Sequence, residues 1–149
     1  MVETKDFCSY DASFMLKEVG YCEPAFAYYC VSNNSESRIL YYNTNEFRGG
    51  YFIDCRYCYN QFNKENCGYL ADRYVDVPLL YEAIKWLWEK HDIEISQSYV
   101  NAMKGHSFMI CGKDCILYDS DENGEYFSTP EEALNAGVLK TKEFLTKNN

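Results

Sequence analysis

Three cysteines in the middle of the chain have the types and spacing of a metal site. Cys55 and Cys58 are separated by two residues, and Cys67 follows nine positions later. A two-residue spacer lets two thiolates reach one tetrahedral zinc ion, so a small structural zinc module is one hypothesis. The candidates for a fourth ligand are Cys111, Cys115 and His106. The competing interpretation, no cofactor at all, treats these thiols as small apolar side chains packed among tyrosines.

A second group of chemistry-bearing residues is the acidic stretch 119–124. Its sequence, Asp-Ser-Asp-Glu-Asn-Gly, matches the first half of an EF-hand calcium loop. The position that should hold a bidentate glutamate is occupied by Pro130. A tight turn built on Asx hydrogen bonds explains the same residues, and Asn123-Gly124 is typical of a type I′ hairpin turn. We therefore expect a hairpin here and no calcium site.

Other catalytic constellations are missing from the sequence. The two histidines are His91, which suits a cation at the end of a helix, and His106, which has no neighbouring pattern typical of a Cys–His enzyme. No P-loop, G-x-S-x-G or G-x-G-x-x-G occurs. The sequence thus favours a protein that is not an enzyme.

Charge narrows the classes of partner. The chain has 149 residues, with 23 Asp and Glu against 14 Lys and Arg, a net charge of −9. Direct binding of nucleic acid is disfavoured because it needs clustered cations. An acidic inhibitor of a nucleic-acid enzyme is an alternative hypothesis, although the carboxylates are scattered along the chain. No signal-peptide pattern and no membrane-spanning stretch is present, so we expect a cytoplasmic protein with reduced thiols and no membrane association.

The elements of the first half are a helix and a hairpin. Apolar residues at 12, 15, 16 and 19 predict a helix over residues 9–20, with Ser9 or Asp11 as its cap and Gly20 at its end. Residues 26–31 and 38–42 have the composition of strands and flank a polar turn. The segment 43–73 carries weak signals and is interpreted as a loop-rich excursion containing the Cys and Tyr residues.

The second half begins with the clearest helix of the chain. We expect Asp76 and Pro78 to start it and Leu80, Ala83, Ile84, Leu87 and Trp88 to form its buried stripe. Strands are predicted near residues 93–99, 107–111, 115–119 and 125–127. A capping box at residues 129–132 predicts a last helix with a buried stripe at 134, 137, 138, 141 and 145. Consecutive antiparallel strands indicate an α+β fold, a hairpin plus a meander packed by about three helices, in a single domain over 1–149.

Two segments together resemble a group of small uncharacterised proteins from gut Bacteroidales genomes and their phages or prophages. The first runs from Phe7-Cys8-Ser9-Tyr10 through a helix ending in Gly20 to residues 23–29, and the second is the Pro-initiated helix at residues 77–91. The chain also closes similarly at residues 128–134. The resemblance covers about half the chain and implies a scaffold, with no activity or catalytic residue to transfer.

An aromatic surface is the remaining functional signal. Tyrosine occurs 15 times, and aromatic residues make up 17% of the chain. We expect Tyr81 and Trp86 to form an exposed edge for a protein partner, because a Trp88 in the core stripe leaves Trp86 outside it. The leading hypothesis is a non-enzymatic interaction protein of a mobile-element or phage-accessory type. A homodimer is compatible with such an edge.

Overall fold

The computed structural model describes residues 3–23, 27–31, 38–42 and 74–145. The predicted excursion at 43–73 lies outside the described residues. The chain divides into two compact units, Met1–Pro78 and Leu79–Asn149, and each is described by itself below. The expectation of a single domain stays a prediction.

The first unit combines one helix with a three-stranded antiparallel sheet. A short 3-10 turn, η1 (Thr4–Asp6), precedes helix α1 (Tyr10–Glu18). Strands β1 (Ala27–Val31), β2 (Arg38–Tyr42) and β3 (Tyr74–Asp76) form the sheet in the order β2-β1-β3, and α1 packs against β3. The predicted hairpin is therefore confirmed, and β3 joins its open side.

Helix α1 is shorter than the predicted range 9–20, but Ser9 caps it and Gly20 follows its end as predicted. The Ser9 hydroxyl accepts a hydrogen bond from the Ala12 amide at 3.2 Å and satisfies a free donor of the first turn. Gly20 has a φ of +96°, and the following Tyr21 amide donates back to the Leu16 carbonyl at 2.8 Å. Such a left-handed glycine just after a helix is the usual way to satisfy its last carbonyls.

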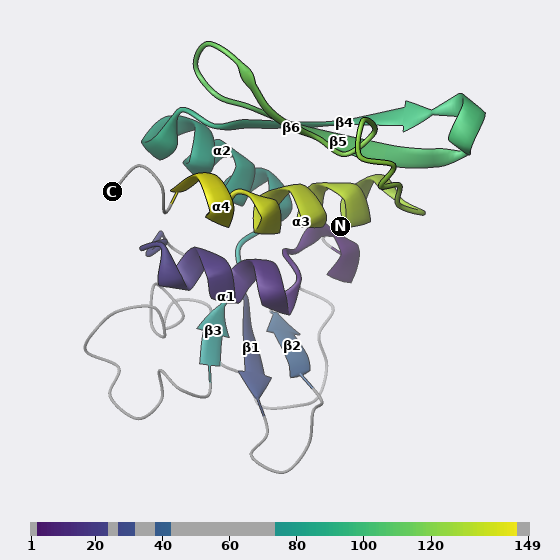
Figure 1. The fold of residues 1–149 in the computed structure, drawn as a ribbon. Coiled ribbons are helices and arrows are strands. Elements are labelled where there is room, and N and C mark those ends of the chain that lie inside the picture. Colours follow the sequence, from purple (N-terminus) through teal and green to yellow (C-terminus); the bar gives the residue numbers. More distant parts are fainter. Residues whose placement is uncertain (1–2, 24–26, 32–37, 43–73, 146–149) are drawn as a thin grey trace. The chain divides into compact units, whose positions relative to one another are not determined.

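The second unit contains two long helices, one short helix and a meander. In chain order these are α2 (Leu80–His91), β4 (Glu94–Val100), the 3-10 turn η4 (Asn101–Met103), β5 (Gly105–Cys111), β6 (Ile116–Asp119), α3 (Pro130–Lys140) and α4 (Lys142–Leu145). The strands are antiparallel in the order β4-β5-β6. Helices α2 and α3 lie on the same side of this sheet (Figure 1).

One face of this sheet forms the core of the second unit. Ile95 lies opposite Ile110 and Gln97 opposite Phe108, so these side chains share a face. Helix α3 packs on β4 and β5, and Gly137 makes this approach possible. A Cβ atom at Gly137 would stand 2.8 Å from Ile95 Cγ2 and 3.2 Å from Phe108 Cδ2, too close for any other residue without movement.

The capped start of α3 is confirmed. Thr129 Oγ1 accepts from the Glu132 amide at 3.1 Å, and Pro130 occupies the first helical position. Of the predicted buried stripe, residues 137, 138, 141 and 145 are buried, whereas Leu134 is only partly buried. The neighbouring Ala133 is fully buried instead. The helix is interrupted at Thr141, whose hydroxyl donates to the Val138 carbonyl at 2.6 Å, and α4 follows.

The α+β class of antiparallel strands and helices is confirmed, with one difference in organisation. The hairpin and the meander belong to two separate three-stranded sheets. Among the described residues, no helix has the length and apolar character needed to span a membrane.

Candidate functional site

Helix α2 is positioned by interactions at both of its ends. The Leu79 amide donates to Glu82 Oε1 at 3.2 Å, so the helix begins at Leu80. The expectation that Asp76 and Pro78 start this helix is wrong, because Asp76 belongs to β3 and pairs with Tyr28. At the other end Asp92 adopts a left-handed conformation with φ of 55°, and Lys90 and His91 lie at the negative end of the helix dipole.

The exposed side of α2 carries aromatic side chains. Tyr81 is 68% exposed and Trp88 is 51% exposed, and Ile84 between them is partly exposed. Their spacing of i, i+3 and i+7 places all three on one side of the helix. We call Tyr81, Ile84 and Trp88 the α2 aromatic face.

The sequence-based assignment of the two tryptophans is wrong. Trp86 is 8% exposed and its indole lies edge-on to the His91 ring, with centroids 4.9 Å apart. Trp88, expected in the core, is exposed instead, and Ile84, also expected there, is only partly buried. The reason is that α2 contacts both β4 and α3, so a wide side of the helix is buried. This side contains Leu80, Ala83 and Leu87 and extends to Trp86. Tyr81 is exposed as expected, and its role in binding stays a prediction.

Charged side chains border the aromatic face. Lys85 Nζ lies 3.8 Å from Glu89 Oε1, and both side chains are more than half exposed. Burial raises the pKa of the Glu82 carboxyl, and the hydrogen bond from Leu79 partly offsets this effect. A polar border around an apolar centre is the usual anatomy of a protein–protein contact.

The acidic loop after β6 is a hydrogen-bonded turn. Asp119 Oδ1 accepts from the Asp121 amide at 3.0 Å, and Asn123 Nδ2 donates to the Asp119 carbonyl at 2.8 Å. Tyr126 Oη donates to Asp121 Oδ1 at 2.5 Å, and this bond is the main cause that raises the pKa of the Tyr126 hydroxyl. The prediction of an Asx-rich turn is confirmed. The turn is not of type I′, because Gly124 has a positive φ but Asn123 does not. The expected hairpin and the predicted strand at 125–127 are wrong, because Phe127 forms only an isolated bridge, and its partner is His106 of β5 and not a residue of β6.

The described cysteines are separate thiols. Cys8 is buried, Cys111 is intermediate, and Cys22 and Cys115 are exposed. Cys111 lies opposite Ile116 in the ladder, so it does not face Cys115 across the hairpin. Within the described ranges no three His, Cys, Asp or Glu residues form a group that could hold a metal ion. The zinc candidates Cys55, Cys58 and Cys67 lie outside the described residues.

Two features of the site were not assigned from the sequence. Trp88 belongs to the exposed face, and the spacing of Tyr81, Ile84 and Trp88 is the signal that would have grouped them. The second feature is β4 as one of the two edge strands of the second unit's sheet, the other being β6. Alternation predicted this strand, but sequence alone did not reveal which strand lies at an edge.

Comparison with known proteins adds no relative. No protein-family model, no curated protein and no solved structure matches the chain. The resemblance to small Bacteroidales and phage proteins stays a prediction.

Proposed function

We propose that this protein is a non-enzymatic interaction domain that binds a protein partner through the α2 aromatic face. The observation that carries the proposal is the exposure of Tyr81 and Trp88 on the same side of a helix whose opposite side is buried. Aromatic side chains combine a large contact area with few rotatable bonds, and they dominate the binding energy of many interfaces.

The exposed aromatic area is large enough to matter for binding. Covering about 100 Å² of apolar surface on each of Tyr81 and Trp88 would contribute about 2.5 kcal/mol per residue before the costs of association. Removing both side chains should therefore weaken a complex by at least tenfold, since each 1.4 kcal/mol corresponds to a factor of ten.

The charge of the chain favours a protein partner with a basic or neutral surface. The net charge is −9, and such a charge repels nucleic acid while it steers cationic proteins toward an encounter. An accessory role in a mobile element is proposed only because of the expected resemblance to small proteins of gut Bacteroidales genomes and their phages or prophages. The zinc module and the acidic inhibitor of a nucleic-acid enzyme stay alternative predictions.

The test uses a double variant and a matched control. Tyr81→Ser/Trp88→Ser removes the aromatic face, and Ile116→Ser removes an apolar side chain that is 61% exposed on β6. Both variants should keep the stability of the wild type within about 0.5 kcal/mol, because the altered side chains are exposed. Each protein is immobilised and exposed to an extract of gut Bacteroidales cells, the source that the resemblance suggests. A protein retained by the wild type is then purified and titrated against each variant by calorimetry.

We expect a protein retained by the wild type and by Ile116→Ser but not by the double variant. Equal retention by the double variant would contradict the proposed surface. Turnover of a substrate in a broad hydrolase screen, lost on Cys55→Ser, would overturn the non-enzymatic assignment.

A further inference from the structure

Strand β4 is an open edge with little protection against pairing. It has seven residues, longer than an average strand, and in the described part of the chain no strand pairs with its outer side. Sheet edges are normally protected by proline, by lysine or other charges, or by bulges. β4 contains no proline, its only charged residue is Glu94 at the first position, and its register with β5 is unbroken.

The hydrogen bonds that β5 makes on its side away from β4 show which backbone groups of β4 point outward at the open edge. The His106 amide and carbonyl both pair with Phe127, at 2.8 Å each. The Phe108 amide donates to Ser120 Oγ, and its carbonyl accepts from the Ser120 amide at 2.9 Å. His106 and Phe108 therefore direct their backbone groups away from β4.

The residues of β4 opposite these two must also point their backbone groups outward. Tyr99 lies opposite His106, and Gln97 lies opposite Phe108. Because the backbone groups of His106 and Phe108 point away from β4, these are the non-hydrogen-bonded pairs of the antiparallel ladder, and the backbone groups of Tyr99 and Gln97 point away from β5. By alternation Ile95 belongs to the same set. The N–H and C=O groups of Ile95, Gln97 and Tyr99 thus line the open edge, while those of Ser96 and Ser98 are used in the ladder with β5.

We propose that β4 is the interface of a homodimer, in which the two copies of β4 pair antiparallel about a two-fold axis at Gln97. In this register Gln97 lies opposite Gln97 of the second copy, and Ile95 opposite Tyr99 of the second copy. All three outward-pointing residues then form hydrogen-bonded pairs, which gives six bonds and a continuous six-stranded sheet. This surface is distinct from the α2 aromatic face, and the inference does not depend on the proposed function.

The side chains of β4 suit this register. Tyr99, which is 55% exposed and lies edge-on to His106, would stand next to Ile95 of the second copy, and such aromatic and β-branched pairs stabilise a sheet. Ser96 would lie opposite Ser98, and both are exposed. The two Glu94 carboxylates would stand at opposite ends of the seam, each opposite a Val100, so no like charges meet.

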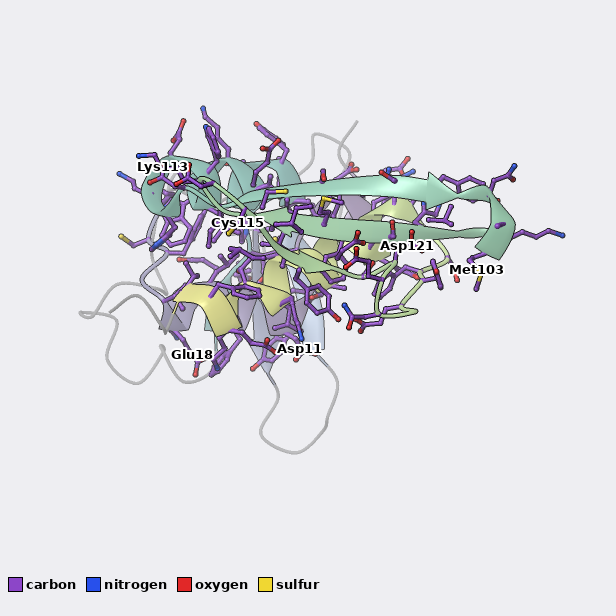
Figure 2. The ribbon with its side chains drawn as sticks, turned by 45° about the horizontal axis from the view of Figure 1, so that its top comes forward. Asp11, Glu18, Met103, Lys113, Cys115 and Asp121 are labelled. Carbon is purple, nitrogen blue, oxygen red and sulfur yellow. The ribbon has the colours of Figure 1, made fainter. Side chains whose placement is uncertain are left out.

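The proposed seam would run along β4 between the two ends of the sheet. Met103 marks the tip between β4 and β5, while Lys113 and Cys115 lie at the other end of the sheet (Figure 2). A contact made by one strand on each side is small, so we expect a reversible dimer rather than an obligate one. Measurements should therefore span about 1 µM to about 1 mM in protein.

The first test needs no substitution. Sedimentation equilibrium should show the mass rising from 17.5 kDa toward twice that value as concentration increases. Over the same range, NMR-detected hydrogen exchange at the amides of Ile95, Gln97 and Tyr99 should slow by at least tenfold. The amides of Ser96 and Ser98 are the internal control, since the ladder with β5 protects them at every concentration.

The second test fixes the register with charges. Ser96→Lys/Ser98→Lys would place lysine opposite lysine in the seam, whereas Ser96→Lys/Ser98→Glu would place lysine opposite glutamate. Both variants alter the same two exposed positions. We expect the first to be monomeric and the second to keep the dimer, with the difference reduced by salt.

Several outcomes would overturn the inference. A monomer up to about 1 mM would do so, as would a dimer unaffected by Ser96→Lys/Ser98→Lys. Two folded variants that are both monomeric would reject the register about Gln97. If a variant fails to fold, the exchange measurement on the wild type decides, and unchanged exchange at Gln97 refutes the seam.

Discussion

The approach of α3 to the sheet can be tested at a single atom. Gly137→Ala would place a methyl group 2.8 Å from Ile95 Cγ2 and 3.2 Å from Phe108 Cδ2. Ile95 cannot easily rotate away because its branched side chain is stiff and it is 6% exposed. Overpacking of this kind costs about 1–3 kcal/mol, whereas alanine gains about 1 kcal/mol over glycine inside a helix. We expect a net loss of about 1 kcal/mol.

The loss can be measured by urea denaturation. With a slope of about 2 kcal/mol/M, the midpoint should fall by about 0.5 M. Ala136→Gly, one position earlier in α3, measures the propensity effect alone and should lower stability by about 1 kcal/mol. An Ile95→Ala background removes the 2.8 Å contact and leaves only those with the Phe108 ring, so Gly137→Ala should cost less there than in the wild-type background. A more stable Gly137→Ala in the wild-type background would refute the close packing of α3 on β4 and β5.

Three further predictions concern polar groups. Thr129→Ala removes the cap of α3 and should lower the free energy of unfolding by about 1 kcal/mol, while Thr129→Ser should keep it, as measured by thermal or urea denaturation. Asp121→Asn should lower the pKa of Tyr126 toward its ordinary value of 10.0, which a ¹³C NMR titration of labelled tyrosine would detect and an unchanged titration would contradict. Burial raises the pKa of the Glu82 carboxyl above 4.5, so the folded state binds this proton more tightly than the unfolded state does. The wild type should therefore lose stability as pH rises above 4.5, relative to Glu82→Gln, which retains an acceptor for the Leu79 amide. The same pH dependence of unfolding in both proteins would reject this prediction.

The sequence predicted those elements whose local signals are strong. Ser9, Gly20 and Thr129 act as caps or helix ends as expected, because each satisfies backbone groups that any helix of this sequence would leave unpaired. The short interval between the predicted strands at 107–111 and 115–119 also indicated the hairpin of β5 and β6. A register shift at Ile110 and Cys111 makes Ile116 the partner of Cys111.

The tryptophans of α2 show why the candidate site was harder to predict. Apolar residues lie on both sides of the stripe formed by Leu80, Ala83 and Leu87. Periodicity alone therefore does not decide whether Trp86 or Trp88 is the buried tryptophan. The choice is made by tertiary packing, because α2 has two neighbours, β4 and α3, instead of one. The outward backbone groups of β4 depend on strand order, which is likewise a tertiary property.

The two sheets differ in how far apart in the chain their partners lie, and this has a consequence for the order of folding. In the second unit Val100 pairs with Gly105 and Cys111 with Ile116, each five positions apart. In the first unit Cys30 pairs with Tyr74, 44 positions away. Closing the longer loop costs about 2 kcal/mol more in chain entropy. We therefore expect the meander to assemble early from local contacts, whereas β3 docks onto β1 in a slower step.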